Sequence, residues 1–364
     1  TSVTPTLTLD KPGTYTVRLI VNDGAVNSAP DTANVSTLNS PPIADAGPDQ
    51  SGRVGETVTL DGDGSSDVDG DTLSYDWSLT TKPTGSIAIL SNPSTPQAKL
   101  TIDKAGTYVA QLVVKDGLAN SARDTAAVTT LNSKPVAEAG PDQTGLVGAT
   151  IMLDGSASTD VDGNALTYQW SFTAKPPGSA ATIADPMAVV TTFALDKPGT
   201  YVLQLIVHDG SVDSDPDTTT VTTVNSKPVA YAGADRTASV GATIQLDGSG
   251  STDVDGDALT YTWALTGKPL GSNATISDPN EAKPTFAIDK PGTYIAQLIV
   301  NDGKVDSDPD TMTVNTVNSQ PVADAGPDQQ GVIGATITLN GAGSSDVDGD
   351  SLTYQWALIS QPIG

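Results

Sequence analysis

The chain has 364 residues and is strongly acidic, with 43 Asp and Glu against 17 Lys and Arg and a formal net charge of −26. This charge argues against a nucleic-acid or anionic-lipid partner, because phosphate affinity comes from Lys and Arg side chains. The sequence has no Cys and one His, which excludes disulfide scaffolds, thiol catalysis and zinc-thiolate sites. No apolar run approaches the roughly 18 residues of a membrane-spanning helix.

An internal repeat with a period of 93 residues organises the whole sequence. Trp77, Trp170, Trp263 and Trp356 keep this spacing without an insertion or deletion between them. A period of this length is that of a self-contained domain and is too long for a solenoid repeat. We therefore expect three complete domains and a partial domain at each end. The expected segments are a C-terminal half-domain at 1–41, complete domains at 42–134, 135–227 and 228–320, and an N-terminal half-domain at 321–364.

The predicted elements of each unit are short strands separated by turns rich in Gly, Pro, Asp and Asn. In the first complete unit, apolar residues alternate with polar ones in runs at 57–60, 73–79 and 108–114. Such an alternation predicts half-buried strands. We expect about seven strands and no helix per unit, which predicts an all-β fold of tandem seven-stranded immunoglobulin-like β-sandwiches. Residues 1–41 are expected to supply the last three strands of a sandwich, and residues 321–364 the first three.

Two aromatic residues per unit mark the predicted core. Trp77 lies in the third predicted strand, the usual core position of the immunoglobulin fold. Tyr108 ends a DKAGTY segment that begins at Asp103. This segment predicts a tyrosine corner, in which the hydroxyl group bonds the backbone at the start of the strand. Because most aromatic residues take such core positions, few remain for a surface that stacks sugars or bases.

These residues carry a resemblance to a known family. The stretch DGSGSTDVDGDALTYTW at 247–263, followed by KPGTYIAQLIVNDGKVDSDPDTMTV at 290–314, resembles tandem PKD domains. The resemblance implies immunoglobulin-like extracellular modules of the kind found in bacterial surface proteins, secreted hydrolases and polycystin. The chain departs from many PKD domains after the Trp, where WSLTTKPTG replaces a W-x-F-G-D-G turn. No ligand property of that turn is therefore carried over.

An acidic loop that reads SDVDGD at 66–71 recurs in every unit with small changes. Carboxylates at alternating positions of a Gly-containing loop are oxygen ligands of the kind that Ca²⁺ prefers. An EF-hand is excluded, because no helices flank the loop and Ser78 replaces the Glu of its twelfth position. In an immunoglobulin-type sandwich this loop, the turn at Asp116 and the linker at Asn39 gather at one end of the domain. Three segments thus bring oxygen atoms to one pole.

The resemblance implies a calcium site at this pole, since PKD domains of some secreted collagenases bind Ca²⁺ with this set of positions. The ligands expected by resemblance are the linker Asn, two loop Asp and the turn Asp of each unit. They are Asn39, Asp67, Asp69 and Asp116; Asn132, Asp160, Asp162 and Asp209; Asn225, Asp253, Asp255 and Asp302; and Asn318, Asp346 and Asp348. The expected dissociation constant is about 10⁻⁴–10⁻³ M, as in other extracellular modules. The alternative is that these residues only cap their own turns.

The linkers TTLNSKP and TTVNSKP are short, lack Gly and contain Pro, which predicts an elongated, semi-rigid rod. The favoured hypothesis is an extracellular structural or adhesive protein, a calcium-stiffened rod, stalk or filament at a bacterial cell surface. Its expected partner is itself, head to tail or within a long array that forms a fibre, or another surface protein. The alternative is a spacer array that presents a binding or catalytic domain outside this segment.

Catalysis within this segment is not expected, so the chain is predicted not to be an enzyme. Paired carboxylates could act as the acid and base of a glycosidase. However, every Asp pair recurs in every unit, whereas an active site is usually made once per chain. The single His208 occupies a position that holds Asn22, Lys115 and Asn301 elsewhere, which favours a surface substitution.

Overall fold

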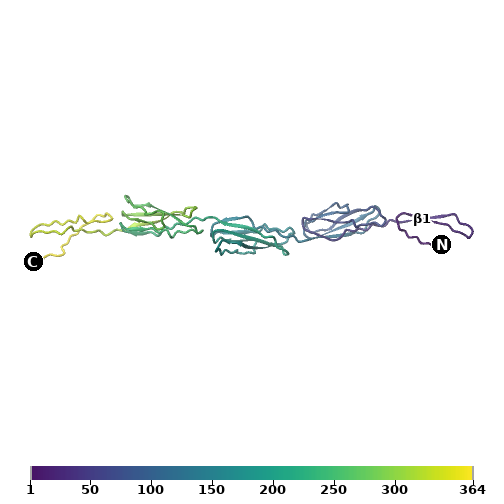
Figure 1. Cartoon of the computed structure of the whole chain (residues 1–364), viewed down its shortest axis with the longest axis horizontal. Helices are drawn as coiled ribbons and strands as arrows, with labels where there is room; N and C mark the ends of the chain where they lie inside the picture. The colour runs from purple at the N-terminus through teal and green to yellow at the C-terminus, as the bar shows by residue number, and fades with distance from the viewer. Residues whose placement is uncertain (1, 363–364) are drawn as a thin grey trace.

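The computed structural model describes residues 2–362 and shows a narrow rod in which the units follow one another along one axis (Figure 1). The two ends of the chain lie near opposite tips of the rod. Strands and turns make up the described residues, and no helix occurs among them. The predicted all-β class is confirmed. Residue 1 and residues 363–364, which belong to the two predicted half-domains, lie outside the described residues.

The first complete unit contains seven strands. They are β3 (Gln50–Gly52), β4 (Thr57–Thr59), β5 (Ser74–Thr81), β6 (Leu90–Ser91), β7 (Lys99–Thr101), β8 (Thr107–Lys115) and β9 (Asp124–Thr130). One sheet has the order β3-β9-β8-β5, and the other has the order β4-β7-β6. Strand β3 runs parallel to β9, and the other neighbours are antiparallel. Two such sheets form the predicted immunoglobulin-like sandwich.

The second and third units repeat this plan without a counterpart of β6, so they contain six strands in place of the expected seven. The second unit contains β10 (Gln143–Gly145), β11 (Thr150–Asp154), β12 (Thr167–Ala174), β13 (Val190–Ala194), β14 (Thr200–His208) and β15 (Asp217–Thr223). The third contains β16 (Arg236–Ala238), β17 (Thr243–Gln245), β18 (Thr260–Gly267), β19 (Thr285–Ala287), β20 (Thr293–Asn301) and β21 (Asp310–Thr316). Their larger sheets have the orders β10-β15-β14-β12 and β16-β21-β20-β18, and their smaller sheets pair β11 with β13 and β17 with β19.

Each complete unit has a hydrophobic core of its own. In the first unit, Trp77 on β5 is directly opposite Leu112 on β8, and both side chains are buried. The alternation predicted for β8 is seen in its burial, since every second residue from Tyr108 to Val114 faces the core. Burying a large apolar side chain contributes about 1.5–3 kcal/mol. Because the three cores do not share residues, each unit can fix the geometry of its own loops.

The partial units at the two ends contain fewer strands than expected. Residues 2–41 contain two strands in place of three, β1 (Thr14–Leu19) and β2 (Asp31–Ser36), which form an antiparallel pair. In place of the three strands expected beyond residue 321, the described residues contain only an isolated bridge between Val322 and Ser345. The missing strands would pair with the other half of a sandwich, which these segments lack. Accordingly, Trp356 is 47% exposed, whereas the equivalent Trp77 is 3% exposed.

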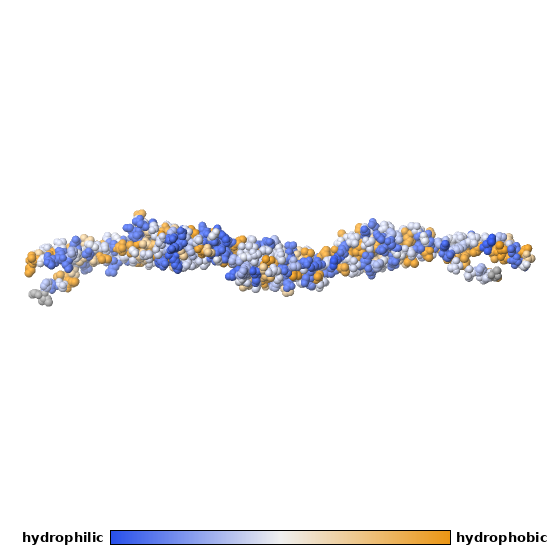
Figure 2. All heavy atoms as spheres, in the orientation of Figure 1, coloured by the Kyte–Doolittle hydropathy of each residue, from blue (hydrophilic) through white to orange (hydrophobic). Residues whose placement is uncertain are grey.

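The face of the rod drawn in Figure 2 carries hydrophilic residues along its whole length. On the face drawn in Figure 2, polar residues extend along all the units and separate small apolar patches from one another. No helix among residues 2–362 has the length and hydrophobicity needed to cross a bilayer. With a net charge of −26, neighbouring rods are expected to repel one another at low ionic strength.

Candidate metal centre

Each complete unit has an acidic pole, which in the first unit consists of residues 39–40, 67–71 and 116–119. Hydrogen bonds tie the linker to the other two segments. The Asn39 side chain donates Nδ2–H to Asp116 Oδ2 at 2.8 Å, and the Ser40 backbone N–H donates to Asp69 Oδ2 at 2.6 Å. The linker, loop and turn therefore meet at one end of the sandwich, as the predicted topology requires.

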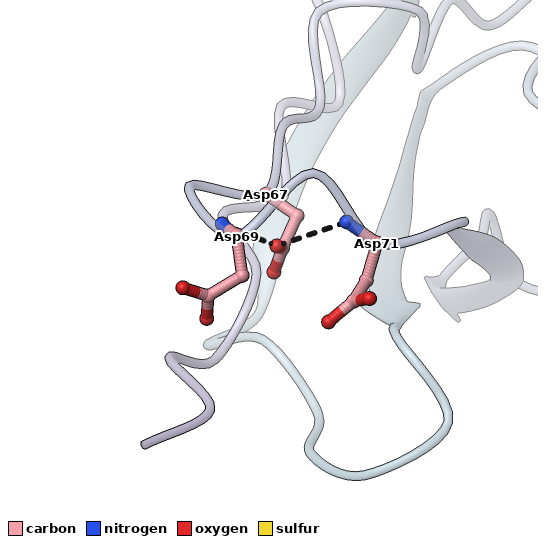
Figure 3. A group of neighbouring side chains, drawn as sticks. All are labelled: Asp67, Asp69 and Asp71. Atoms are coloured by element: carbon pink, nitrogen blue, oxygen red, sulfur yellow. Dashed lines mark hydrogen bonds between the residues drawn. The ribbon is translucent and has the colours of Figure 1, made fainter. Parts of the chain in front are cut away.

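The acidic loop folds around the Asp67 side chain. Asp67 Oδ1 accepts hydrogen bonds from the backbone N–H groups of Asp69 at 2.7 Å and Asp71 at 3.3 Å (Figure 3). Gly70 has a φ of 83°, a conformation that Gly adopts without steric cost and that lets the chain reverse. The three carboxylates consequently project from the same side of the loop, and one oxygen from each lies within 4.8 Å of the others. Three anions at this separation attract a cation.

Several carboxylate oxygens at these poles are buried and have no hydrogen-bond partner in the protein. These atoms are Asp67 Oδ2, Asp160 Oδ2, Asp162 Oδ1, Asp253 Oδ2, Asp255 Oδ1 and Asp348 Oδ1. A buried charge normally has a counter-charge or coordinates a metal, because desolvation without compensation is costly. Ca²⁺ takes 6–8 oxygen ligands from carboxylates, amide carbonyls and water. The unpartnered carboxylate oxygens, together with the side-chain oxygen of Asn39 in the first unit, therefore suit a calcium ion.

Asp116 has a different role from the loop carboxylates. Its Oδ1 accepts the backbone N–H groups of Leu118 at 2.7 Å and Ala119 at 2.6 Å, and its Oδ2 accepts the Asn39 side chain. The hydrogen bond from Asn39 is the main cause that lowers the pKa of Asp116, followed by the bonds from the turn backbone. Because both oxygens are engaged, Asp116 orients the linker Asn in this structure and is not a member of the group of three carboxylates.

The other units repeat this arrangement of linker and turn. The linker residues Asn132 and Asn225 donate to Asp209 and Asp302, each at 2.7 Å. These bonds are the main cause of the lowered pKa of both carboxyl groups. The backbone N–H groups of Ser133, Ser226 and Ser319 donate to the second loop Asp, as Ser40 does in the first unit.

The expected ligand set lacked one carboxylate that the structure brings to the loop, Asp71. Its signal is present in the sequence, since it is the last Asp of the repeated D-x-D-G-D string. The equivalent residues are Asn164, Asp257 and Asp350. Among the described residues, the other group of three close carboxylates contains Asp346, Asp348 and Asp350.

The second and third units differ from the first at this position. In the second unit, Asn164 Nδ2 donates to Asn132 Oδ1 at 2.9 Å, so an amide replaces the third carboxylate. In the third unit, Lys304 Nζ donates to Asp257 Oδ2 at 2.8 Å and to Asn225 Oδ1 at 2.9 Å. The acidic poles of the second and third complete units therefore each have one negative charge fewer than that of the first.

The opposite end of each unit has a tyrosine pole, which in the first unit consists of residues 86–87 and 103–108. The Tyr108 hydroxyl donates to Asp103 Oδ1 at 2.7 Å and lies 2.8 Å from the Lys104 carbonyl, and it accepts the Lys104 backbone N–H at 2.9 Å. Asp103 also accepts Ser86 Oγ–H and the Ile87 N–H, each at 2.6 Å. The predicted tyrosine corner is thus present, and a carboxylate completes it.

These bonds change the pKa of both partners at the tyrosine pole. The Ser86 hydroxyl, followed by the Tyr108 hydroxyl, lowers the pKa of Asp103 to about 2. Burial is the main cause that raises the pKa of Tyr108, and the bond to Asp103 adds to it. The pKa of Asp196 and that of Asp289 are also lowered to about 2, chiefly by Ser179 and Ser272.

The joint between the first and second units places the linker against both. The Leu131 backbone N–H donates to the Gly52 carbonyl at 2.9 Å, and Arg53 Nε donates to the Asn132 carbonyl at 3.4 Å. The Asn132 side chain contacts Asp209 in the next unit. One short segment therefore connects β3 of one domain to the acidic pole of the following domain.

His208, the single His, lies at the end of β14, where its Nδ1 is 2.9 Å from Asp213 Oδ1. Its side chain is 43% exposed and that of Asp213 is 70% exposed. A solvent-exposed pair of this kind contributes at most about 1 kcal/mol. The contact is that of a surface residue next to a turn.

Two family descriptions match the sequence. The family of PKD domains of the KIAA0319-like type matches residues 46–130 and 232–316, and the family described as "PKD domain" matches residues 132–224. Each match covers most of one complete repeat unit.

Among curated relatives, the Dyslexia-associated protein KIAA0319 of Homo sapiens is 32% identical over 364 residues, which cover 96% of this chain and 33% of the relative. Collagenase ColA of Clostridium perfringens is 30% identical over 128 residues, which cover 35% of this chain and 10% of the relative. The solution structure of the PKD domain from the KIAA 1837 protein is 35% identical, has a TM-score of 0.22, and covers 26% of this chain and 91% of that chain.

The chain spans about a third of the length of the first curated relatives that it matches. These broadly matching relatives come from Homo sapiens, Mus musculus and Rattus norvegicus. The expected bacterial origin is therefore not supported, since the bacterial relatives match only about a third of the chain.

Proposed function

Since the chain belongs to the PKD domain family, as a tandem array of its modules, we propose that it is an extracellular structural or adhesive rod with joints stiffened by Ca²⁺. The observation that carries the proposal is the set of buried, unpartnered carboxylate oxygens at the acidic poles. Their position matters because the linker from the preceding unit is hydrogen-bonded to the same pole. A cation at the pole would therefore hold two neighbouring units together.

The residues that would hold the ion in the first unit are Asp67, Asp69 and Asp71, with the side-chain oxygen of Asn39 from the linker. The ion would supply positive charge to a group of three carboxylates. Asp116 keeps the Asn39 amide nitrogen engaged, so the amide oxygen stays free for another contact. The linker N–H of Ser40 stays bonded to Asp69 throughout. The protein would thus position the linker, and the ion would offset the repulsion among the three loop carboxylates.

A role outside catalysis agrees with the repetition of the site. Each complete unit has an acidic pole, and the linker from the preceding unit is hydrogen-bonded to it. The relatives that match 83% and 96% of this chain are not named as enzymes. We further propose that the partner of the rod is another surface protein or a further copy of the chain along the same axis.

The alternative is a spacer that presents a binding or catalytic domain outside this segment. The relatives offer a specific reason to keep it, because Collagenase ColA matches over only 10% of its length. In that relative, most of the chain lies outside the matching region. A rod with stiff joints would serve such a spacer equally well, so the calcium test applies to both functions.

Thermal unfolding of the full chain in millimolar Ca²⁺ and then in excess chelator tests the proposal. A ligand that binds only the folded state raises its stability by RT ln(1 + [L]/Kd), which is about 1.4 kcal/mol at ten times Kd. We expect a higher Tm in Ca²⁺ and a smaller gain in the Asp67→Asn, Asp69→Asn variant. Asp63→Asn is the matched control, since it removes one charge from an exposed residue of the same loop. An unchanged Tm for the unmodified chain would contradict the calcium function.

A further inference from the structure

The acidic pole of the third unit contains a cation that belongs to the protein. The Lys304 ammonium lies 2.8 Å from Asp257 Oδ2 and 2.9 Å from the side-chain oxygen of Asn225. Asp257 is the equivalent of Asp71, and Asn225 is the linker residue that joins the second unit to the third. One ammonium group therefore bonds the acidic loop and the linker at the same time.

No other repeat places a positive charge at this position. The residues equivalent to Lys304 are Ala25, Leu118 and Ser211. In the first unit the third loop carboxylate, Asp71, has no cationic neighbour at this turn because Leu118 is apolar. In the second unit the carboxylate itself is replaced by Asn164. The second and third units thus each have one negative charge fewer at the pole than the first unit. The second unit loses the charge through Asn164, and the third offsets it through Lys304.

We infer that Lys304 acts as a tethered cation that competes with Ca²⁺ at the joint between the second and third units and holds this joint closed when calcium is absent. The inference rests on the proposed calcium function, because it assigns a regulatory residue to one of the sites. It makes the joints unequal: the joint before the first unit depends on calcium most, and the joint before the third unit, where Lys304 bonds the loop and the linker, depends on it less.

The competition follows from charge and position. Lys ends in a compact ammonium with three donors on a flexible chain, so it can bond two oxygens without a fixed geometry. A positive charge next to Asp257 repels a second cation, and at short range this repulsion corresponds to at least about tenfold in affinity. Asp253 Oδ2 and Asp255 Oδ1 remain unpartnered in the presence of Lys304. The site is therefore weakened toward calcium and not abolished.

The ion pair is not a stability element by itself. The Lys304 side chain is 60% exposed and that of Asp257 is 34% exposed. Exposed pairs contribute little to the free energy of unfolding. The effect of Lys304 is consequently expected in cation binding and in the local order of the linker, and not in the Tm of the calcium-free protein.

Titration of the full chain with calcium, measured by isothermal titration calorimetry, tests the inference. Asp67→Asn, Asp160→Asn and Asp346→Asn remove a loop carboxylate from each of the other sites, so that the third site dominates the signal. In this background, Lys304→Leu introduces the residue found in the first unit. We expect it to raise the affinity for Ca²⁺ at least about tenfold. Lys283→Leu removes an equal charge from the same unit away from the pole, and we expect no change.

The calcium-free part of the inference has a separate readout. In excess chelator, the Ser226 amide should exchange its hydrogen more slowly than the equivalent Ser40 amide of the first unit. Lys304→Leu should abolish the difference. Equal exchange rates at the two amides in the unmodified chain would overturn the inference.

The two proposals can fail separately. Absence of calcium binding by the unmodified chain, including its first unit, would overturn the calcium function. The role of Lys304 alone would be overturned if the first unit of the unmodified chain binds calcium but Lys304→Leu, added to the three Asp→Asn changes, leaves the calcium affinity unchanged.

Discussion

The two poles of one unit use the same type of side chain for different purposes. At the tyrosine pole, both oxygens of Asp103 are bonded by Ser86, Ile87 and Tyr108. At the acidic pole, one oxygen of Asp67 organises the loop backbone and the other is buried without a partner. A carboxylate that the protein satisfies by itself fixes a fold. A carboxylate that it leaves unsatisfied creates a place for a cation.

The two poles also differ at the joints, because the linker from the preceding unit is hydrogen-bonded to the acidic pole. The acidic pole is therefore where a small change in solution can alter the shape of the rod. The tyrosine pole should respond to acid and to mutation but not to calcium.

The largest effect is expected from Tyr108→Phe. This substitution removes a buried hydroxyl that bonds Asp103 and the Lys104 backbone, so the first unit should lose about 1–3 kcal/mol of its free energy of unfolding. Chemical denaturation measures the loss, which should be the same in calcium and in chelator. Tyr231→Phe is the control, because the Tyr231 side chain is 50% exposed and its loss should be small. If the loss of stability in Tyr108→Phe depended on calcium, the two poles would not act independently, which would contradict this account.

Acid should weaken the tyrosine poles. The pKa of Asp103, Asp196 and Asp289 is lowered from 3.8 to about 2. A carboxyl group with a lowered pKa adds stability that is fully present above its unfolded pKa and is lost as pH falls toward its folded pKa. Stability should therefore decrease between pH about 4 and about 2, as followed by denaturation at several pH values. Asp103→Asn should make the stability of the first unit less sensitive to acid over this range. An unchanged dependence of its unfolding free energy on pH would contradict this role of Asp103.

A smaller effect is expected from Asp67→Asn at the acidic pole. The amide oxygen can still accept the loop N–H groups, so the folded structure in chelator should keep its stability to within about 0.5 kcal/mol. The gain of about 1 kcal/mol in calcium should be lost from the first unit. Denaturation with and without calcium measures both quantities. Asp67→Asn with its full calcium gain retained would show that the unpartnered oxygen binds no ion.

The smallest effect is expected from Asn164→Asp. It restores the third loop carboxylate of the second unit and so should raise calcium affinity there a few-fold. It should also loosen the calcium-free joint slightly, because the bond from Asn164 to Asn132 is lost. Calorimetry of the full chain measures the affinity. A lower affinity would indicate that the amide is the better ligand.

Much of the fold could be predicted because the relevant signals are local and repeated. The alternation in β8 predicted its inward face, and the DKAGTY segment predicted the corner at Tyr108. The strand number at the chain ends was wrong for residues 2–41 and 321–362, because a strand forms only when its partner strand is present. Strand propensity alone does not contain that information.

The candidate site could be predicted only in part. The meeting of the linker, loop and turn followed from topology, and Asn39 does contact Asp116. The place of Asp71 depends on how the loop turns at Gly70, and the contacts of Lys304 depend on side-chain conformation. The D-x-D-G-D spacing is a signal for Asp71, whereas residue spacing gives none for the contacts of Lys304. The calcium ligation itself stays a prediction.

Distances between neighbouring units show whether calcium stiffens the joints. The chain has no Cys, so Ser94→Cys and Met187→Cys place one spin label on each of the first two units at equivalent, exposed positions. We predict a broad distance distribution by double electron–electron resonance in chelator and a narrow one in millimolar calcium. The Met187→Cys and Asn280→Cys pair, which spans the joint with Lys304, should change less. Equally broad distance distributions in calcium and in chelator at the joint between the first and second units would contradict a calcium-stiffened rod.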